Sequence, residues 1–177
     1  GETLIVYLQM LHSAPEQDKF RALYEAYSGL MYHVADRLLP DDAEAEDAVH
    51  QALVAIIENL DKIARPVDPK TRALVCLITE RKALDILRSR SHLSDAAFEE
   101  SAQGLPVPLP GDGGLADAMS ALPAAYREAL LLRYQQGYTA REIAHMLGKK
   151  TGAVQKLLTR AKAALREELD ERGIDHA

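Results

Sequence analysis

The chain has 177 residues, of which 47% are hydrophobic and 5% aromatic, and its formal net charge is −6. This hydrophobic content excludes a disordered chain, and the scarcity of aromatic residues favours helices packed on helices over a β-sheet. The single cysteine, Cys76, excludes an internal disulfide and a cysteine-rich zinc site, and its apolar neighbours predict a small buried hydrophobic residue.

Membrane and export signals are not apparent in the sequence. No apolar stretch approaches the about 18 residues that a membrane-spanning helix needs, so we expect no membrane insertion. The apolar opening segment "LIVYLQML" has only eight residues and no basic segment before it, which argues against a secretory signal. The cytoplasm is therefore the expected location.

Helix start signals divide the first third of the chain. Ser13 and Glu16 have the spacing of a capping box, and apolar residues then recur at helical spacing. The acidic segment "LLPDDAEAED" ends this helix at its proline and begins a second one, with Asp41 or Asp42 as the N-cap. Its acidic first turn suits the positive end of a helix.

A third helix is predicted to begin at the pair Asp68 and Pro69 and to end at about Arg90. The segment before it reads as a loop. The helix is apolar on more than one side, so we expect it to be central in its bundle. Asp85 and Arg88 are three residues apart, which permits a local ion pair.

A shift in composition separates two predicted domains. The segment 93–114 is rich in proline and glycine and has no apolar period, which is typical of a linker. The predicted organisation is therefore all-α, with two small helical domains at residues 1–92 and 115–177.

Four signals organise the second domain. Pro123 begins a helix, and Thr139 with Glu142 forms a second capping box. Gly148 interrupts the short helix that follows, and the last helix runs over about 151–168.

The spacing around Gly148 predicts a helix-turn-helix. Ala144 provides a small residue where two crossing helices come closest, and Gly148 tolerates the left-handed backbone of the turn. Apolar anchors lie on both sides of the turn at Ile143, Leu147, Val154 and Leu158.

One face of the last helix is basic and polar, and the opposite face is apolar. Between Lys149 and Lys162 the chain has five basic residues and no acidic one. The first turns of such a helix enter the major groove of DNA, where cations bind phosphates or base edges and Gln155 can pair with adenine. The candidate DNA-binding residues are Lys149, Lys150, Thr151, Gln155, Lys156, Thr159, Arg160 and Lys162.

The alternative is an ordinary solvated helix face. Surface helices normally mix charges of both signs, however, and this face has no carboxylate before Glu167. A DNA-binding surface is therefore the preferred interpretation.

The chain resembles the sigma-70 superfamily, specifically its extracytoplasmic-function (ECF) type. The resemblance covers residues 18–92 and 115–168. It rests on "AEAEDAVHQALVAI" and "ITERKALDILRSR" in the first part, and on "LPAAYREALLLRYQQGYTAREIAHMLGKKTGAVQKLLTRAKAALRE" in the second.

This resemblance implies a dissociable subunit of RNA polymerase, with a sigma2-like and a sigma4-like domain, and no enzymatic activity. The second domain would read the −35 element of promoter DNA with the basic face described above. The third helix and the loop before it would engage the −10 element as a single strand. The matching cations are Lys70, Arg72, Arg81, Lys82, Arg88 and Arg90.

The same resemblance implies protein partners. Glu46, Asp47, His50 and Gln51 match the helix that docks on the clamp helices of the largest polymerase subunit. The polymerase flap is a second expected contact, and an anti-sigma factor is a further partner common in the family.

Several positions depart from the family pattern. His50 replaces a usual glutamine, and Leu157 replaces a usual arginine on the recognition helix. Residues 61–92 contain no Tyr, Trp or Phe, although single-strand capture usually relies on aromatic stacking.

Two other classes of function compete with this interpretation. A helix-turn-helix regulator that never joins polymerase would bind a palindromic duplex as the free protein. An enzyme is less consistent with the sequence, because the six histidines have no ligand spacing and no phosphate-binding glycine loop is present. We therefore expect no catalytic residue, no metal and no cofactor.

Overall fold

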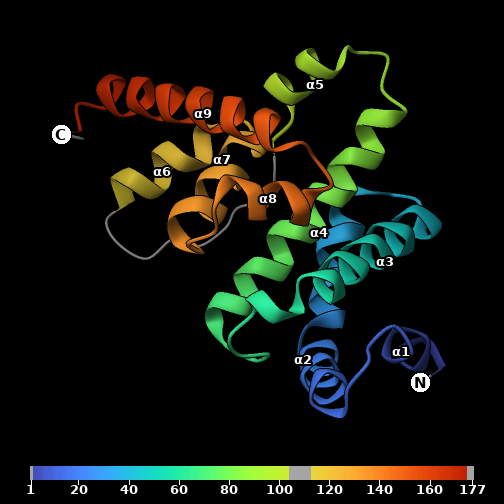
Figure 1. The fold of residues 1–177 in the computed structure, drawn as a ribbon. Helices are drawn as coiled ribbons and strands as arrows, with labels where there is room; N and C mark the ends of the chain where they lie inside the picture. Colours follow the sequence, from blue (N-terminus) through green and yellow to red (C-terminus); the bar gives the residue numbers. More distant parts are fainter. Residues whose placement is uncertain (1, 104–112, 175–177) are drawn as a thin grey trace. The chain divides into compact units, whose positions relative to one another are not determined.

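The computed structural model describes residues 2–103 and 113–174, and in these ranges its regular structure is entirely helical (Figure 1). The all-α prediction is therefore confirmed for the described part of the chain. The chain divides into two compact units, residues 1–89 and 90–177. Part of the expected linker, residues 104–112, lies outside the described residues.

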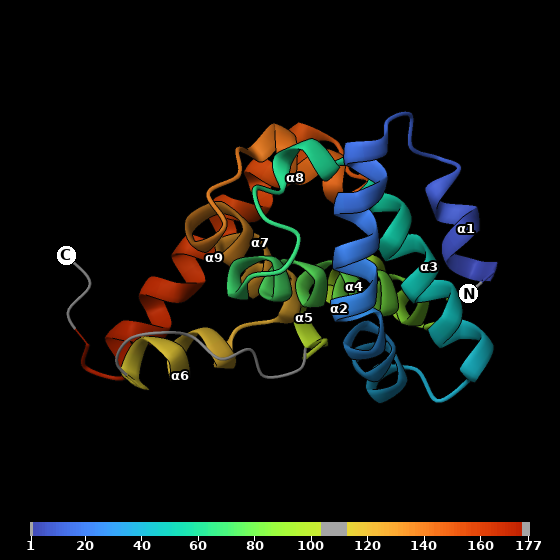
Figure 2. The same cartoon turned by 90° about the horizontal axis from the view of Figure 1, so that it is seen from below.

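The first unit is a bundle of three long helices with a short helix at its N-terminal end (Figures 1 and 2). Helices α2, α3 and α4 each pack on the other two, and α1 packs on α2. The elements are α1 (Glu2–Leu8), α2 (Ala14–Leu38), α3 (Asp42–Glu58), the 3₁₀ turn η1 (Leu60–Lys62) and α4 (Pro69–Ser89).

The predicted starts of α2, α3 and α4 are confirmed by capping hydrogen bonds. The Ser13 side chain accepts from the backbone N–H of Glu16 at 3.2 Å. Asp41 caps α3 by accepting from the N–H of Glu44 at 3.1 Å. Asp68 accepts from the N–H of Lys70 at 2.7 Å. The carboxylate of Glu16 accepts a hydrogen bond from the Ser13 hydroxyl, whereas in the expected capping box it would accept from the backbone N–H of Ser13.

Helix α4 is central in the bundle, as its apolar pattern predicted. Leu74, Val75, Leu77 and Ile78 are at most 2% exposed, although they point in different directions around the helix. Cys76, between them, is only partly buried, so it is more accessible than the predicted buried hydrophobic residue.

Three short helices were not anticipated from the sequence. In α1, Tyr7 and Leu8 are buried against the bundle, which supports a helix of two turns. Helix α5 (Asp95–Ser101) lies inside the expected linker and is capped by the Ser94 side chain. Helix α6 (Gly113–Ala121) begins the second bundle.

In the second unit, α6, α7 and α8 all pack on the long helix α9. The remaining elements are α7 (Ala124–Leu130), the π-helical turn η2 (Leu131–Gln135), α8 (Ala140–Leu147) and α9 (Thr151–Glu171). The π turn places the hydrogen bond from the Gln136 N–H on the carbonyl of Leu131, five residues back.

The turn between α8 and α9 has the predicted helix-turn-helix geometry. Thr139 and Glu142 form a complete capping box, with hydrogen bonds of 3.2 and 3.0 Å. Gly148 ends α8 in the left-handed region at φ 67°. The N–H of Lys149 donates to the carbonyl of Ala144 at 2.9 Å, which closes the turn.

We expect Gly148→Ala to destabilise the second unit by about 1 kcal/mol, because an L-residue pays that much for left-handed backbone. A Cβ at Gly148 would meet no atom within 4 Å, so the cost is conformational and not steric. Gly152→Ala is the matched control, since Gly152 is equally open but lies in a regular helix. The control should match or exceed wild-type stability. Urea unfolding followed by circular dichroism measures both, and equal stability of Gly148→Ala and wild type would contradict the left-handed cap.

Candidate functional site

The candidate DNA-binding residues lie on the outer surface of α9 and, in the case of Lys149 and Lys150, in the turn before it. Val154, Leu158 and Ala161 are buried on one side of the helix. On the other side, Lys149 and Thr151 are partly exposed. The remaining predicted side chains, Lys150, Gln155, Lys156, Thr159, Arg160 and Lys162, are exposed.

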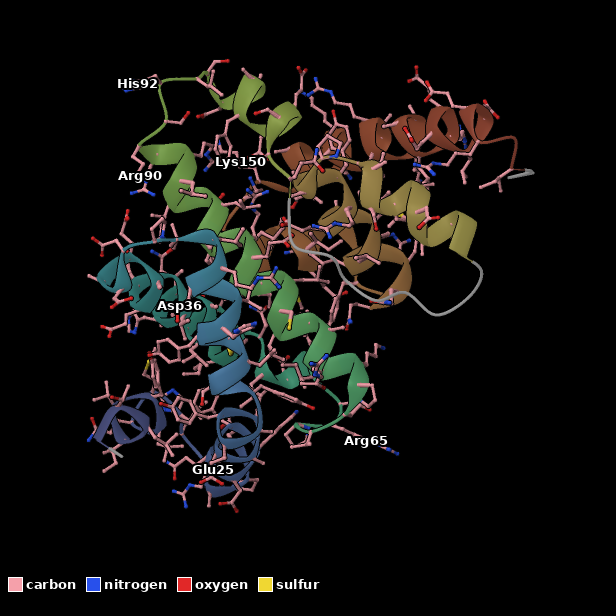
Figure 3. All side chains as sticks on the ribbon, turned by 180° about the vertical axis from the view of Figure 1, so that it is seen from behind. Glu25, Asp36, Arg65, Arg90, His92 and Lys150 are labelled. Atoms are coloured by element: carbon pink, nitrogen blue, oxygen red, sulfur yellow. The ribbon has the colours of Figure 1, made fainter. Side chains whose placement is uncertain are left out.

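Cations at the start of α9 are available to a ligand. The side chains of Lys150, Lys156 and Arg160 form no hydrogen bond or ion pair with any residue that the structure describes. Lys150 is the N-cap residue of α9 (labelled in Figure 3), and no acidic side chain occurs in the first turn. The positive end of the helix and these cations together favour phosphate binding. We call Lys149, Lys150, Gln155, Lys156 and Arg160 the α9 basic face.

The structure distinguishes Gln155 from Thr159. The Thr159 hydroxyl donates to the carbonyl of Gln155 at 3.0 Å, so its proton is used within the helix. The Gln155 side chain is exposed and has no such bond within the described residues, which leaves its amide for a base edge. Leu157 is only partly buried, between the apolar and basic sides.

Lys162 lies further along α9 than the α9 basic face, and it also contacts the ring of Tyr134. Its ammonium lies 5.4 Å from the centre of the Tyr134 ring, and Arg133 lies over the same ring at 5.6 Å. Tyr134 is 58% exposed and sits on the π turn. These contacts place Lys162 at the rim of a groove within the second unit.

This groove has a volume of about 590 Å³ and was not anticipated from the sequence. Apolar side chains from α6, the end of α7, η2 and α9 form most of it, and Lys162 and Arg166 supply positive charge. We call it the α6–α9 groove; its lining residues are Leu115, Met119, Leu130, Leu131, Tyr134, Gln135, Lys162, Leu165, Arg166 and Leu169. The sequence signal that could have indicated this groove is the presence of apolar residues beside basic ones.

On α3, the predicted polymerase-docking residues form one stripe along the helix. Glu46, Asp47 and His50 are exposed and Gln51 is partly exposed. Their spacing places them on one side of the helix. The Gln51 side chain donates to the Asp47 carboxylate at 3.1 Å, which keeps both in the stripe. We call these four residues the α3 polar stripe.

Tyr7 of α1 contacts this stripe, which sequence reasoning did not detect. Its hydroxyl lies 2.8 Å from Nδ1 of His50. Burial raises the pKa of Tyr7 to about 12, with smaller contributions from Tyr32 and Tyr24. The hydroxyl therefore keeps its proton at neutral pH.

The six cations predicted to contact the −10 element do not form one surface. At about 100° per residue, Arg72 lies on the side of α4 opposite to Lys70 and Arg88, and Arg90 follows the last residue of the helix. Lys70, Arg72 and Arg90 are exposed, whereas Lys82 and Arg88 are partly buried. Figure 3 shows Arg65, in the loop before α4, and Arg90 projecting from the two ends of the helix.

Arg81 is the exception among these cations. Its side chain is 1% exposed, and its Nε lies 3.2 Å from the carboxylate of Asp85. Arg88 contacts the same carboxylate at 3.4 Å, which confirms the predicted local ion pair. Arg81 is thus grouped with Asp85 and not with the exposed cations.

An aromatic residue does support the loop before α4, but from inside the bundle. The Tyr27 hydroxyl donates to the carbonyl of Asp68 at 3.0 Å and accepts from its N–H at 2.9 Å. Tyr27 is 8% exposed, so its ring is not presented for stacking on a base.

Among the described residues, no group of three or more His, Cys, Asp and Glu side chains could hold a metal ion. None of the described helices combines the length and apolarity needed to cross a membrane.

Two family models match the chain in the order of its two units. Residues 23–92 match sigma-70 region 2, and residues 113–165 match sigma-70 region 4. The match to region 2 contains α3 and α4, and the match to region 4 contains the helix-turn-helix.

Curated relatives cover nearly all of the chain. It is 31% identical over 172 residues to "Probable RNA polymerase sigma factor RfaY" of Xanthomonas campestris pv. campestris, covering 88% of this chain but only 42% of that protein. It is 28% identical to the ECF RNA polymerase sigma factor SigL of Mycobacterium tuberculosis, covering 92% and 95% of the two chains. It is 32% identical to the RNA polymerase sigma-E factor of Streptomyces avermitilis, covering 80% and 79%.

Proposed function

Because the chain belongs to the sigma-70 superfamily, in its ECF class, we propose that it binds core RNA polymerase and directs it to specific promoters. Separate surfaces on its two units carry out these two tasks. The observation that carries this proposal is the presence of two oppositely charged surfaces in one chain. Glu46 and Asp47 supply the acidic charge of the α3 polar stripe, and the α9 basic face is positive and lacks carboxylates. The acidic stripe suits a protein partner with basic residues, and the basic face suits DNA.

The α9 basic face reads the −35 element as duplex DNA. The first turns of α9 enter the major groove, where Lys150, Lys156 and Arg160 bind phosphates or base edges. Gln155 supports direct base readout, since its exposed amide can donate to and accept from adenine.

The segment that matches sigma-70 region 2, residues 23–92, engages the −10 element with the exposed cations at the two ends of α4 and in the loop before it. Because the described aromatic residue at this loop, Tyr27, is buried, base capture relies on polar groups and backbone. A DNA contact by Arg81 would require its ion pair with Asp85 to open, so the exposed cations Lys70, Arg72 and Arg90 make the first contacts.

Each of the two units also provides one contact to the polymerase. The α3 polar stripe binds the clamp helices of the largest subunit, and the α6–α9 groove accepts an apolar segment of the flap. The groove supports this assignment because its lining is mainly apolar and its rim is basic. An anti-sigma factor that covered these surfaces would block the same steps. A role in transcription initiation supports a cytoplasmic location, and it requires no catalytic residue in the chain.

Run-off transcription tests the proposed function. Core polymerase from the source organism is incubated with a library of promoter fragments, with and without the protein, and the transcripts are sequenced. We expect a set of transcripts that depends on the protein and starts downstream of a shared pair of elements. Absence of any protein-dependent transcript, with tight binding of a palindromic duplex by the free protein, would favour the helix-turn-helix regulator instead.

A further inference from the structure

Helix α1 lies outside the segment matched by the region 2 family model, and Figure 2 shows it beside α3. Its Tyr7 contacts His50 of the α3 polar stripe. Tyr7 is 3% exposed. Its ring packs against Phe20, Tyr24 and His50, with centroid distances of 5.9, 6.2 and 5.6 Å. These contacts hold the Tyr7 hydroxyl in one place, 2.8 Å from Nδ1 of His50.

The direction of this hydrogen bond follows from the burial of the phenol. Within the described part of the chain, His50 is the hydrogen-bond partner of the Tyr7 hydroxyl, and that hydroxyl forms no second hydrogen bond. If Nδ1 carried the proton, the phenol hydrogen would lack an acceptor, which is unfavourable for a buried donor. A hydroxyl that donates to Nδ1 satisfies the phenol, and in a neutral imidazole this arrangement leaves the ring proton on Nε2.

We propose that Tyr7 is a positioning residue for polymerase binding: it holds His50 as the Nε2–H tautomer, with that N–H presented as a hydrogen-bond donor in the α3 polar stripe. This inference rests on the proposed function of the stripe. His50 is exposed, and its Nε2 has no hydrogen-bond partner among the described residues. The stripe therefore offers the polymerase two carboxylates and one oriented donor, which together select a surface with basic residues and an acceptor.

A double-mutant cycle measures this role. Tyr7→Phe keeps the ring packing and removes only the hydroxyl. We expect it to weaken binding of the full chain to core polymerase by about three- to tenfold, the usual net effect of losing one hydrogen bond. In a His50→Gln background, Tyr7→Phe should have no further effect, since an amide donor needs no tautomer. Tyr24→Phe is the matched control, because it removes a hydroxyl from the same aromatic cluster without touching His50.

Nitrogen-15 NMR of the histidine ring gives a readout that does not depend on the polymerase. Wild type should show a protonated Nε2 and an unprotonated Nδ1 at His50, and Tyr7→Phe should show a mixture of tautomers. A protonated Nδ1 in wild type, or an unchanged tautomer in Tyr7→Phe, would overturn the inference.

The binding results separate this inference from the proposed function. Failure of wild type to bind core polymerase, or wild-type binding by the Glu46→Lys/Asp47→Lys variant, would overturn both. Loss of binding in that variant with wild-type binding by Tyr7→Phe would overturn the role of Tyr7 alone.

Discussion

Replacing Glu46 and Asp47 together by lysine is expected to reduce promoter-specific transcription by at least about 100-fold, because like charges placed across an interface cost several kcal/mol and each 1.4 kcal/mol is a factor of ten. Both carboxylates are exposed in the α3 polar stripe, so the reversal changes the surface and not the core. The measurements are the dissociation constant for core polymerase and the yield of run-off transcript.

Glu25→Lys/Asp36→Lys is the matched control for this reversal. Glu25 and Asp36 are exposed acidic residues of α2, labelled in Figure 3, and the double change alters the net charge by the same amount. The control should bind polymerase like wild type. The competing explanation is that Glu46 and Asp47 only stabilise the N-terminal part of α3 through its dipole. In that case thermal stability would fall and the affinity for polymerase would not.

The second large effect is expected on the affinity for promoter DNA. We predict that Lys156→Glu/Arg160→Glu lowers the affinity of the polymerase complex for its promoter by at least about 100-fold at physiological salt, because two phosphate contacts become repulsions. If each cation neutralises one phosphate, the slope of log K against log salt should become shallower by about 1.8. Both side chains are exposed and form no ion pair with a described residue, so their loss leaves the fold unchanged.

The control for this change is Arg21→Glu/Arg37→Glu, which alters the net charge equally on exposed positions of α2. Promoter affinity is measured by fluorescence anisotropy over a series of salt concentrations, with the promoter identified by run-off transcription. Equal losses in the two variants would mean that net charge, and not the α9 basic face, governs the affinity. An unchanged salt slope in Lys156→Glu/Arg160→Glu would show that these side chains do not neutralise phosphates.

Features that depend on neighbouring residues were predicted correctly. Ser13, Asp41 and Asp68 cap the helices that follow them, because a capping side chain reaches an N–H only two or three residues away. Gly148 occupies the left-handed position because residues with a Cβ are disfavoured there. The separation of apolar and basic sides of α9 follows from the helical period alone.

Features that depend on distant segments were not predicted. The contact between Tyr7 and His50 joins residues 43 positions apart, and it requires α1 to fold back onto the bundle. Lys162 was predicted to bind DNA, and its contact with Tyr134 on the π turn, at the rim of the groove, was not predicted. Arg81 reads as one more surface cation in the sequence, and its burial beside Asp85 is a property of the packed bundle.

The difference between the features that were predicted and those that were not has a physical basis. Helical period, capping spacing and the need for a left-handed residue are short-range constraints, so the all-α class, the helix-turn-helix and the basic side of α9 could be read from the order of residues. Burial and the contacts of side chains around the α6–α9 groove and the α3 polar stripe depend on how helices pack. Packing depends on the shapes of many side chains at once, so a short stretch of sequence does not determine which surface a helix packs against.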